Sequence, residues 1–221
     1  MISSTSHQVF IAGATGYTGR VLVPLLAKSS EWKPLAHVRP GSRHAEVLPT
    51  AIERREVDLA NTAALISAMA GCEAVVSLIG TTRAQFGPGV SYETVDIGTT
   101  QLLVNAAKQA GSKRFVLLSS VGASENGVAY LRAKAVAEKI VMTSGLDWII
   151  LRPSAIVGPG RQLPRLLTPL AIVLRYVPGL QRMFDDYRPV HIEVLARAIF
   201  AAVKQASTTG EIWSGKIIWG K

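Results

Sequence analysis

Three glycines between an apolar segment and a helical segment constrain the fold of this chain more than any other feature. Gly13, Gly16 and Gly19 follow the apolar run 9–12, and a helical pattern begins at Arg20. A strand, a glycine-rich turn and a helix in this order form the context of a phosphate-binding loop. Gly13 allows a tight turn with positive φ, Gly16 lets a pyrophosphate approach the backbone, and Gly19 lets the helix pack close to the strand. The first N–H groups of the helix would then face the phosphates. We therefore expect a dinucleotide at Gly13, Thr15, Gly16, Tyr17, Thr18 and Gly19, with an ordinary glycine turn as the alternative.

Apolar runs alternate with helical segments over the first 151 residues. The predicted strands are 9–12, 35–38, 74–79, 115–118 and 148–151, with one more within 52–58, and the predicted helices are 21–29, 62–70, 94–110 and 130–143. Gly71, Gly111 and Gly145 follow three of these helices, where glycine commonly ends a helix. This alternation predicts an α/β fold, a doubly wound parallel sheet with helices on both faces. Ligands of such sheets bind at the carboxyl ends of the strands.

The pattern changes after residue 152, where prolines recur. We predict helices over 166–177 and 191–205 and a late strand over 211–219. A length of 221 residues suits a single domain. We therefore expect one dinucleotide-binding domain over 1–221, with 153–190 as a lid on the substrate side. The segment 163–180 is both basic and apolar, which is typical of a packed lid or, alternatively, of a surface that contacts a membrane or a protein partner.

The formal net charge is +9, and residues 152–221 hold ten Lys and Arg against four Asp and Glu. The arginines are scattered singly among apolar residues, so an anionic cofactor or substrate explains them more simply than nucleic acid. The only cysteine, Cys72, excludes a disulfide framework, and we expect it to be a buried or turn thiol. The N-terminus lacks the basic and apolar regions of a signal peptide, and no apolar run reaches the ~18 residues of a spanning helix. These features predict a cytoplasmic protein.

Two arginines at the end of the second predicted strand bear on the choice of dinucleotide. Arg39 stands twenty residues after Gly19, Arg43 follows it, and no acid occurs before Glu46. This end of the sheet lies beside the adenosine ribose, where an NAD site would carry Asp or Glu. A guanidinium instead suits a 2′-phosphate, which it can bind through two charge-assisted hydrogen bonds. NADP is therefore favoured over NAD, with a solvated loop arginine as the alternative.

The ends of the third and fourth predicted strands supply further cofactor contacts. Asp58 is a candidate partner for the adenine amino group, and it also suits the N-cap of a helix over 59–70. Leu78, Ile79 and Gly80 are expected to line the ribose side of the cofactor.

A serine pair and a Tyr-x-x-x-Lys pattern form the second strong signal. Ser119 and Ser120 follow the fifth predicted strand, and Tyr130 and Lys134 lie on one face of the next helix at i and i+4. A lysine cation favours the charged form of a neighbouring phenol, so this tyrosine can exchange a proton with a carbonyl or alcohol oxygen. A serine hydroxyl can hold the same oxygen. The alternative is a helix surface pair without a chemical role.

With these motifs the chain resembles the short-chain dehydrogenase/reductase superfamily, on its atypical or extended side, over nearly its whole length. The resemblance rests on the glycine loop, Ser119-Ser120, Tyr130-x-x-x-Lys134, and the segments 151–160 and 188–199. Length and layout are especially similar to small atypical reductases related to the Tat-interacting protein, and the chain is also similar to NAD-dependent epimerase/dehydratase-like proteins. The resemblance implies that Ser120 orients the substrate oxygen, Tyr130 is the general acid/base and Lys134 binds the nicotinamide ribose. It also implies that Pro153, Ser154 and Ile156 run under the nicotinamide.

Two departures from the family pattern affect these expectations. The chain is shorter than the sugar-nucleotide epimerases and dehydratases, whose added length binds the nucleotide sugar. Ser120 precedes Tyr130 by only ten residues, so Ser119 or Ser124 is an alternative to it. We expect an NADP-dependent oxidoreductase acting on a small carbonyl or alcohol without a metal. The alternative is a dinucleotide-binding regulatory protein that senses redox state.

Overall fold

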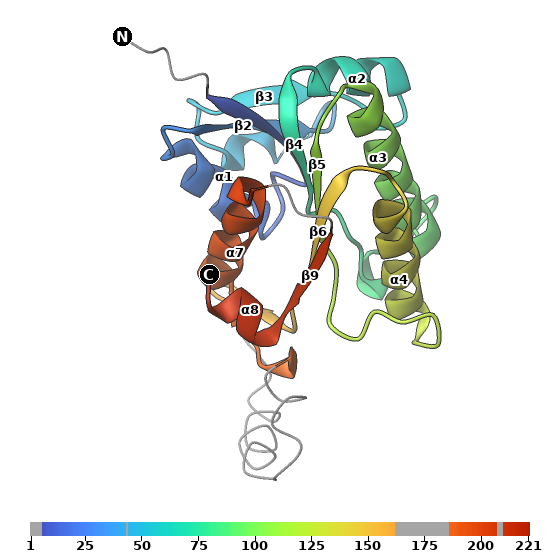
Figure 1. The fold of residues 1–221 in the computed structure, drawn as a ribbon. Helices are drawn as coiled ribbons and strands as arrows, with labels where there is room; N and C mark the ends of the chain where they lie inside the picture. Colours follow the sequence, from blue (N-terminus) through green and yellow to red (C-terminus); the bar gives the residue numbers. More distant parts are fainter. Residues whose placement is uncertain (1–5, 43, 162–185, 207–209) are drawn as a thin grey trace.

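A seven-stranded parallel sheet forms the centre of the protein (Figure 1). The computed structural model describes residues 6–42, 44–161, 186–206 and 210–221. The strand order is β3-β2-β1-β4-β5-β6-β9. The strands are β1 (His7–Ala12), β2 (Trp32–Val38), β3 (Glu53–Glu56), β4 (Cys72–Ser77), β5 (Arg114–Leu118), β6 (Asp147–Arg152) and β9 (Glu211–Ser214). The predicted doubly wound parallel sheet is confirmed, and the order reverses between β1 and β4, where ligands bind in such sheets.

Helices cover both faces of this sheet (Figure 1). One face carries α1 (Gly19–Ala27), α7 (Ile192–Lys204) and the short α8 (Gly215–Trp219), and the other carries α2 (Thr62–Met69), α3 (Thr99–Gln109) and α4 (Ala129–Met142). The smaller elements are η1 (Ala45–Val47), η2 (Arg83–Gln85), the π-helix η3 (Tyr92–Gly98), and β7 (Ile156–Val157) paired in parallel with β8 (Val190–His191). None of the helices in these ranges is long and apolar enough to cross a bilayer.

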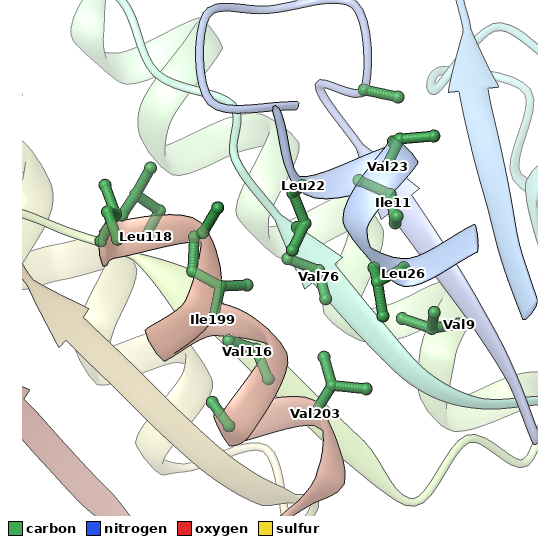
Figure 2. Close-up of a cluster of buried hydrophobic side chains, with 14 of the residues drawn as sticks. Val9, Ile11, Leu22, Val23, Leu26, Val76, Val116, Leu118, Ile199 and Val203 are labelled. Atoms are coloured by element: carbon green, nitrogen blue, oxygen red, sulfur yellow. The ribbon is translucent and has the colours of Figure 1, made fainter. Parts of the chain in front are cut away.

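The sheet separates two hydrophobic cores because neighbouring residues of a strand point to opposite faces. In β1, Val9 and Ile11 pack with the α1 and α7 side, and Phe10 packs with the α2, α3 and α4 side. Figure 2 shows the first core, in which Leu22 of α1 and Ile199 of α7 approach the strands. Each fully buried side chain of this kind contributes about 1.5–3 kcal/mol. The central strands β1, β4 and β5 are therefore apolar on both faces, as their apolar runs predicted, whereas β3 is polar.

The glycine loop has the backbone geometry that its sequence predicted. Gly13 has a φ of +83°, and a Cβ there would lie 3.1 Å from the carbonyl carbon of Leu78. A Cβ at Gly19 would overlap the carbonyl oxygen of Ala14, which confirms that this glycine permits the close packing of α1. The Gly16 N–H donates to the Gly13 carbonyl over 3.0 Å and closes the turn. The loop therefore joins β1 to α1 in a compact turn beside the end of β4.

Two predicted boundaries and one predicted N-cap were wrong for identifiable reasons. The late strand over 211–219 ends at Ser214, because Gly215 has a φ of +40° and starts α8. The helix predicted from residue 94 begins earlier as the π-helix η3, which Ser91 caps by accepting a hydrogen bond from the Thr94 N–H. The helix after β3 begins at Thr62, and its N-cap is Asn61 and not Asp58. The predicted helix over 166–177, the segment 163–180, Arg43 and most of the predicted lid over 153–190 lie outside the described residues.

Candidate dinucleotide site

A cavity of about 470 Å³ lies at the carboxyl ends of the central strands. Its wall combines the glycine loop, the end of β2 and the segment after β4. The lining residues are Gly13, Thr15, Gly16, His37, Arg39, Leu59, Leu78, Ile79, Gly80, Thr81, Gln85, Val90, Val95 and Thr99. Seven of the residues predicted to bind the cofactor thus meet in one cavity: Gly13, Thr15, Gly16, Arg39, Leu78, Ile79 and Gly80.

The residues that line the cavity suit a dinucleotide in their chemistry. Gly13 and Gly16 line it without side chains, and the N-terminus of the nine-residue helix α1 follows directly. Backbone N–H groups and a helix dipole at such a position favour an anion. Arg39 is exposed just after β2 and brings a permanent positive charge to the opposite part of the wall. An elongated ligand with phosphates at the loop and a further anionic group at Arg39 matches this distribution.

His37 is a buried member of the wall. Its Nε2 lies 2.9 Å from the Val57 carbonyl oxygen, and because a carbonyl only accepts, Nε2 carries the hydrogen. Burial lowers the pKa of His37 below its usual value, with a further lowering by Arg39, while the hydrogen bond to Val57 and the charge of Asp58 oppose the shift. The imidazole is therefore neutral at pH 7.

Asp58 lies apart from the cavity wall, although its neighbour Leu59 is part of it. The Asp58 carboxylate is exposed, and its Oδ1 accepts a hydrogen bond from the Ala60 N–H over 2.9 Å. This bond stabilises the turn that leads from β3 to the Asn61 N-cap of α2. In this structure Asp58 therefore stabilises a turn.

Lys134 lies directly behind the cavity wall in a buried ion pair. Its Nζ is 2.7 Å from Oδ1 of Asp96, and the two side chains are 6% and 0% exposed. The other oxygen of Asp96 accepts a hydrogen bond from the Thr81 N–H over 3.1 Å. A Cβ at Gly80 would lie only 2.9 Å from the Lys134 Nζ, so the absence of a side chain at Gly80 leaves the ammonium next to the cavity. The ion pair balances a charge that burial alone would make costly.

Tyr130 lies one turn before Lys134 on α4. The Lys134 Nζ is 5.8 Å from the centre of the half-buried Tyr130 ring, which also contacts the ring of Tyr92 at 5.6 Å between centroids. Ser120, half-buried just after β5, donates its hydroxyl hydrogen to the Val121 carbonyl over 3.3 Å. Tyr130 and Lys134 thus lie on one face of α4, as predicted, and the Lys134 ammonium adjoins the cavity at Gly80.

Ser119 is held by a buried network at the ends of β5 and β6. Its hydroxyl donates to Glu138 Oε1 over 2.5 Å, and Arg152 donates to both oxygens of Glu138 over 2.9 and 2.5 Å. The hydrogen bond to Glu138 raises the pKa of the Arg152 guanidinium. The Ser119 hydroxyl is therefore held by Glu138. The Ser120 hydroxyl makes only the longer bond to the Val121 carbonyl and can reorient more easily.

The remaining predicted cofactor residues do not line the cavity formed by the described residues. The ring of Tyr17 faces Arg161, whose guanidinium carbon lies 5.5 Å from its centre, and its hydroxyl oxygen would be 2.7 Å from a Cβ at Gly158. Thr18 is the buried N-cap residue of α1. The Ser154 hydroxyl donates to the Tyr187 carbonyl over 2.6 Å. The residues concerned are Tyr17, Thr18, Gly19, Pro153, Ser154 and Ile156.

Three polar residues of this region were missed by the sequence reasoning. Asp96 lies between the apolar residues Val95 and Ile97 in a helical stretch, and Glu138 continues the spacing of Tyr130 and Lys134 by another four residues. Both positions carried a signal, because a charge on the buried side of a helix requires a partner. His37 gave no comparable signal. Cys72 is buried in β4, and burial raises its pKa to about 11, as expected for an inert thiol.

Comparisons with known proteins place the chain in a family of dinucleotide-binding proteins. A family described as NAD(P)H-binding matches residues 13–168. Protein FMP52-1, mitochondrial, of Scheffersomyces stipitis is 31% identical over 200 residues, which are 87% of this chain and 87% of that protein. Ceramide reductase of Caulobacter vibrioides is 33% identical over 202 residues, with 91% of this chain and 62% of that protein covered. NADH dehydrogenase [ubiquinone] 1 alpha subcomplex subunit 9, mitochondrial, of Arabidopsis thaliana is 29% identical over 208 residues, with 88% of this chain covered. The chain spans about half, 49%, of the length of that plant protein.

Solved structures share the fold. The Bordetella bronchiseptica enzyme WbmH, solved in complex with NAD+, superposes with a TM-score of 0.66 at 22% identity. The match covers 95% of this chain and 76% of that one. This likeness shows that the two chains share the fold of the sheet and its helices.

Proposed function

The chain belongs to the NAD(P)H-binding family, and from that premise we propose that it is an NADP-dependent oxidoreductase of the short-chain dehydrogenase/reductase type. Its substrate is a small carbonyl compound or the corresponding alcohol. One observation carries this proposal: Tyr130 and the buried ammonium of Lys134 share a helix face next to Gly80, which lines the cavity of the glycine loop. A bound dinucleotide alone needs no such pair.

The residues of the cavity divide the cofactor between them. Gly13 and Gly16 would hold the pyrophosphate at the start of α1, and Arg39 would pair with the 2′-phosphate at the end of β2. Lys134 would bind the nicotinamide ribose, a role supported by the 2.9 Å between its Nζ and a Cβ built at Gly80. When bound, the nicotinamide supplies or accepts a hydride.

Tyr130 manages the proton that accompanies the hydride. In the reducing direction the carbonyl carbon gains the hydride, the electron pair of the C=O π bond moves to the oxygen, and the oxygen takes the proton of the Tyr130 hydroxyl. The cation of Lys134 stabilises the resulting phenolate. The Ser120 hydroxyl, now bonded to the Val121 carbonyl, is free to rotate toward the same oxygen. A general acid of this kind contributes about 10²–10⁴-fold to the rate.

The name of one relative supports the reaction class. Ceramide reductase shares 33% of its aligned residues with this chain, although the chain spans 62% of its length. A reductase activity is thus compatible with this sequence family, while the substrate depends on parts of the proteins that differ.

The test is the replacement Tyr130→Phe, which removes the hydroxyl and keeps the ring. We expect kcat to fall about 10²–10⁴-fold while the Kd of NADPH stays within about twofold. Tyr187→Phe is the matched control, because it removes a tyrosine hydroxyl from an exposed residue outside the cavity wall. Unchanged turnover in Tyr130→Phe would overturn the mechanism.

The alternative function predicted from the sequence, a redox-sensing regulatory protein, gives a different result. Such a protein would bind NADPH tightly and oxidise it with none of a broad panel of aldehydes and ketones, as followed by the absorbance of NADPH. Turnover of any panel member with loss of activity in Tyr130→Phe supports the enzyme.

A further inference from the structure

Three aromatic rings form a row from the proposed acid–base residue to the protein surface. The ring of Tyr92 contacts the ring of Tyr130, with 5.6 Å between centroids, and meets Phe86 edge-on at 4.7 Å. Phe86 is 42% exposed at the outer end of the row. The edge-on geometry of Phe86 and Tyr92 is a favoured arrangement of aromatic pairs, and the rings of Tyr92 and Tyr130 are tilted by 55°. An apolar strip therefore starts at Tyr130 and ends in solvent.

The outer part of the row is held in place by the loop that carries it. The Phe86 N–H donates to the Arg83 carbonyl over 3.2 Å, and Thr82 and Gln85 form a reciprocal cap around η2. The Val90 N–H donates to the Gly87 carbonyl over 2.9 Å and closes the next turn. An exposed aromatic ring on a backbone fixed in this way loses little freedom when a ligand covers it.

The surroundings of the row favour an apolar ligand that begins at the cavity. Gln85 and Val90 of the same loop line the dinucleotide cavity, so the row runs beside it. Val128, two residues before Tyr130, is 68% exposed. The nearby cation of Arg132 is engaged with the Gly127 carbonyl over 2.8 Å. An exposed aromatic side chain connected through a second ring to a proposed catalytic residue suits the apolar part of a ligand.

We propose that Phe86 and Tyr92 form a subsite for the apolar body of the substrate, whose carbonyl or hydroxyl group reaches Tyr130. The substrate class is then an apolar carbonyl compound or alcohol, with a hydrocarbon chain or ring longer than a few carbons. This inference rests on the proposed function, because it takes Tyr130 as the reacting end.

The test measures kcat/KM with NADPH for straight-chain aldehydes from propanal to decanal. In the wild type we expect kcat/KM to rise about two- to fourfold for each added methylene that contacts the rings. The replacement Phe86→Ala should lower the ratio of kcat/KM for decanal to that for propanal at least tenfold, and Phe86→Leu should lower it less. Ile217→Ala is the matched control, because Ile217 is an equally exposed apolar residue, 46%, on α8. It should keep the wild-type ratio.

A ratio in Phe86→Ala equal to that of the wild type, or no dependence on chain length in the wild type, would overturn the subsite. Failure of the proposed function looks different, since then no aldehyde is reduced. In that case the binding of decanol to the NADPH-loaded protein is measured by equilibrium dialysis. Binding at least tenfold weaker in Phe86→Ala supports the subsite without turnover, and equal binding refutes it.

Discussion

Single residues around the cavity differ in how their charge is controlled. Arg39 is exposed and needs no partner to stay charged. Lys134 is buried and has its charge balanced by Asp96, whereas His37 is buried and stays neutral. The wall therefore presents one fixed cation at the rim, one paired cation behind Gly80, and a neutral imidazole between β2 and Val57.

The neutral state of His37 predicts a pH dependence of stability. Its pKa is lower in the folded protein than in the unfolded chain, so the unfolded chain binds the proton first as the pH falls. The contribution is fully present above the unfolded value of about 6.5 and is lost as the pH falls through the folded value. In urea titrations at pH 7.5 and 5.5, we expect His37→Gln to lose less unfolding free energy on acidification than the wild type.

The exposed His44 supplies the control for this experiment. His44→Gln should show the same loss between the two pH values as the wild type. If His37→Gln and the wild type lose equal amounts, the imidazole of His37 is not held neutral by the fold.

Part of the site could be predicted from individual residues of the sequence. The glycine loop, Arg39 and the segment Leu78–Gly80 were found because each follows a recognisable strand, and the carboxyl ends of parallel strands meet. The partners of Lys134 and Ser119 were not found. These partners are the carboxylates of Asp96 and Glu138. Which buried groups of two different elements meet depends on tertiary packing and not on the local sequence pattern.

At the scale of elements, the π-helix η3 docks on α4 through two contacts with matching spacing. Tyr92 and Asp96 lie four residues apart on η3, and their respective partners Tyr130 and Lys134 lie four residues apart on α4. The apolar contact comes first along both helices and the ion pair follows. Departures from regular α-helix are frequent at functional sites. The spacing of apolar residues does not distinguish a π-helical turn from the start of an α-helix, which is why the predicted helix start at residue 94 was wrong.

The ion pair between these elements predicts a large effect on stability. Asp96→Ala leaves the Lys134 ammonium buried without a countercharge, so we expect a loss of about 3–5 kcal/mol in unfolding free energy. Asp96→Ala combined with Lys134→Met should recover part of that loss, because the second change removes the unpaired charge. Chemical denaturation of the three proteins measures these differences.

An exposed pair between Lys139 of α4 and Glu125 of the preceding loop serves as the control. Lys139 and Glu125 lie 3.8 Å apart, and both side chains are mostly exposed. Glu125→Ala should leave the unfolding free energy unchanged, because solvent screens such pairs. A loss in Asp96→Ala as small as in Glu125→Ala would show that Lys134 does not depend on the pair.

At the scale of the whole molecule, the sheet order explains why distant segments form one cavity. The chain starts at the centre of the sheet, builds β2 and β3 on one side, and then returns to build β4, β5 and β6 on the other. This reversal leaves the glycine loop after β1 between Arg39 after β2 and Gly80 after β4. The sequence predicted the class of sheet, a doubly wound parallel one, because alternating strands and helices leave few possible topologies.

The central claim is that this cavity binds NADP(H), with Arg39 on the 2′-phosphate. Its most direct measurement is the calorimetric Kd of NADPH and of NADH for the wild type and Arg39→Ala, with Arg197→Ala, an exposed arginine on α7, as control. A charge-assisted hydrogen bond contributes about 1.5–3 kcal/mol, or roughly 10–100-fold in affinity. We predict that the wild type and Arg197→Ala bind NADPH at least tenfold more tightly than NADH and that Arg39→Ala removes most of this preference. Equal affinity of the wild type for the two dinucleotides, or binding of neither, would contradict the claim.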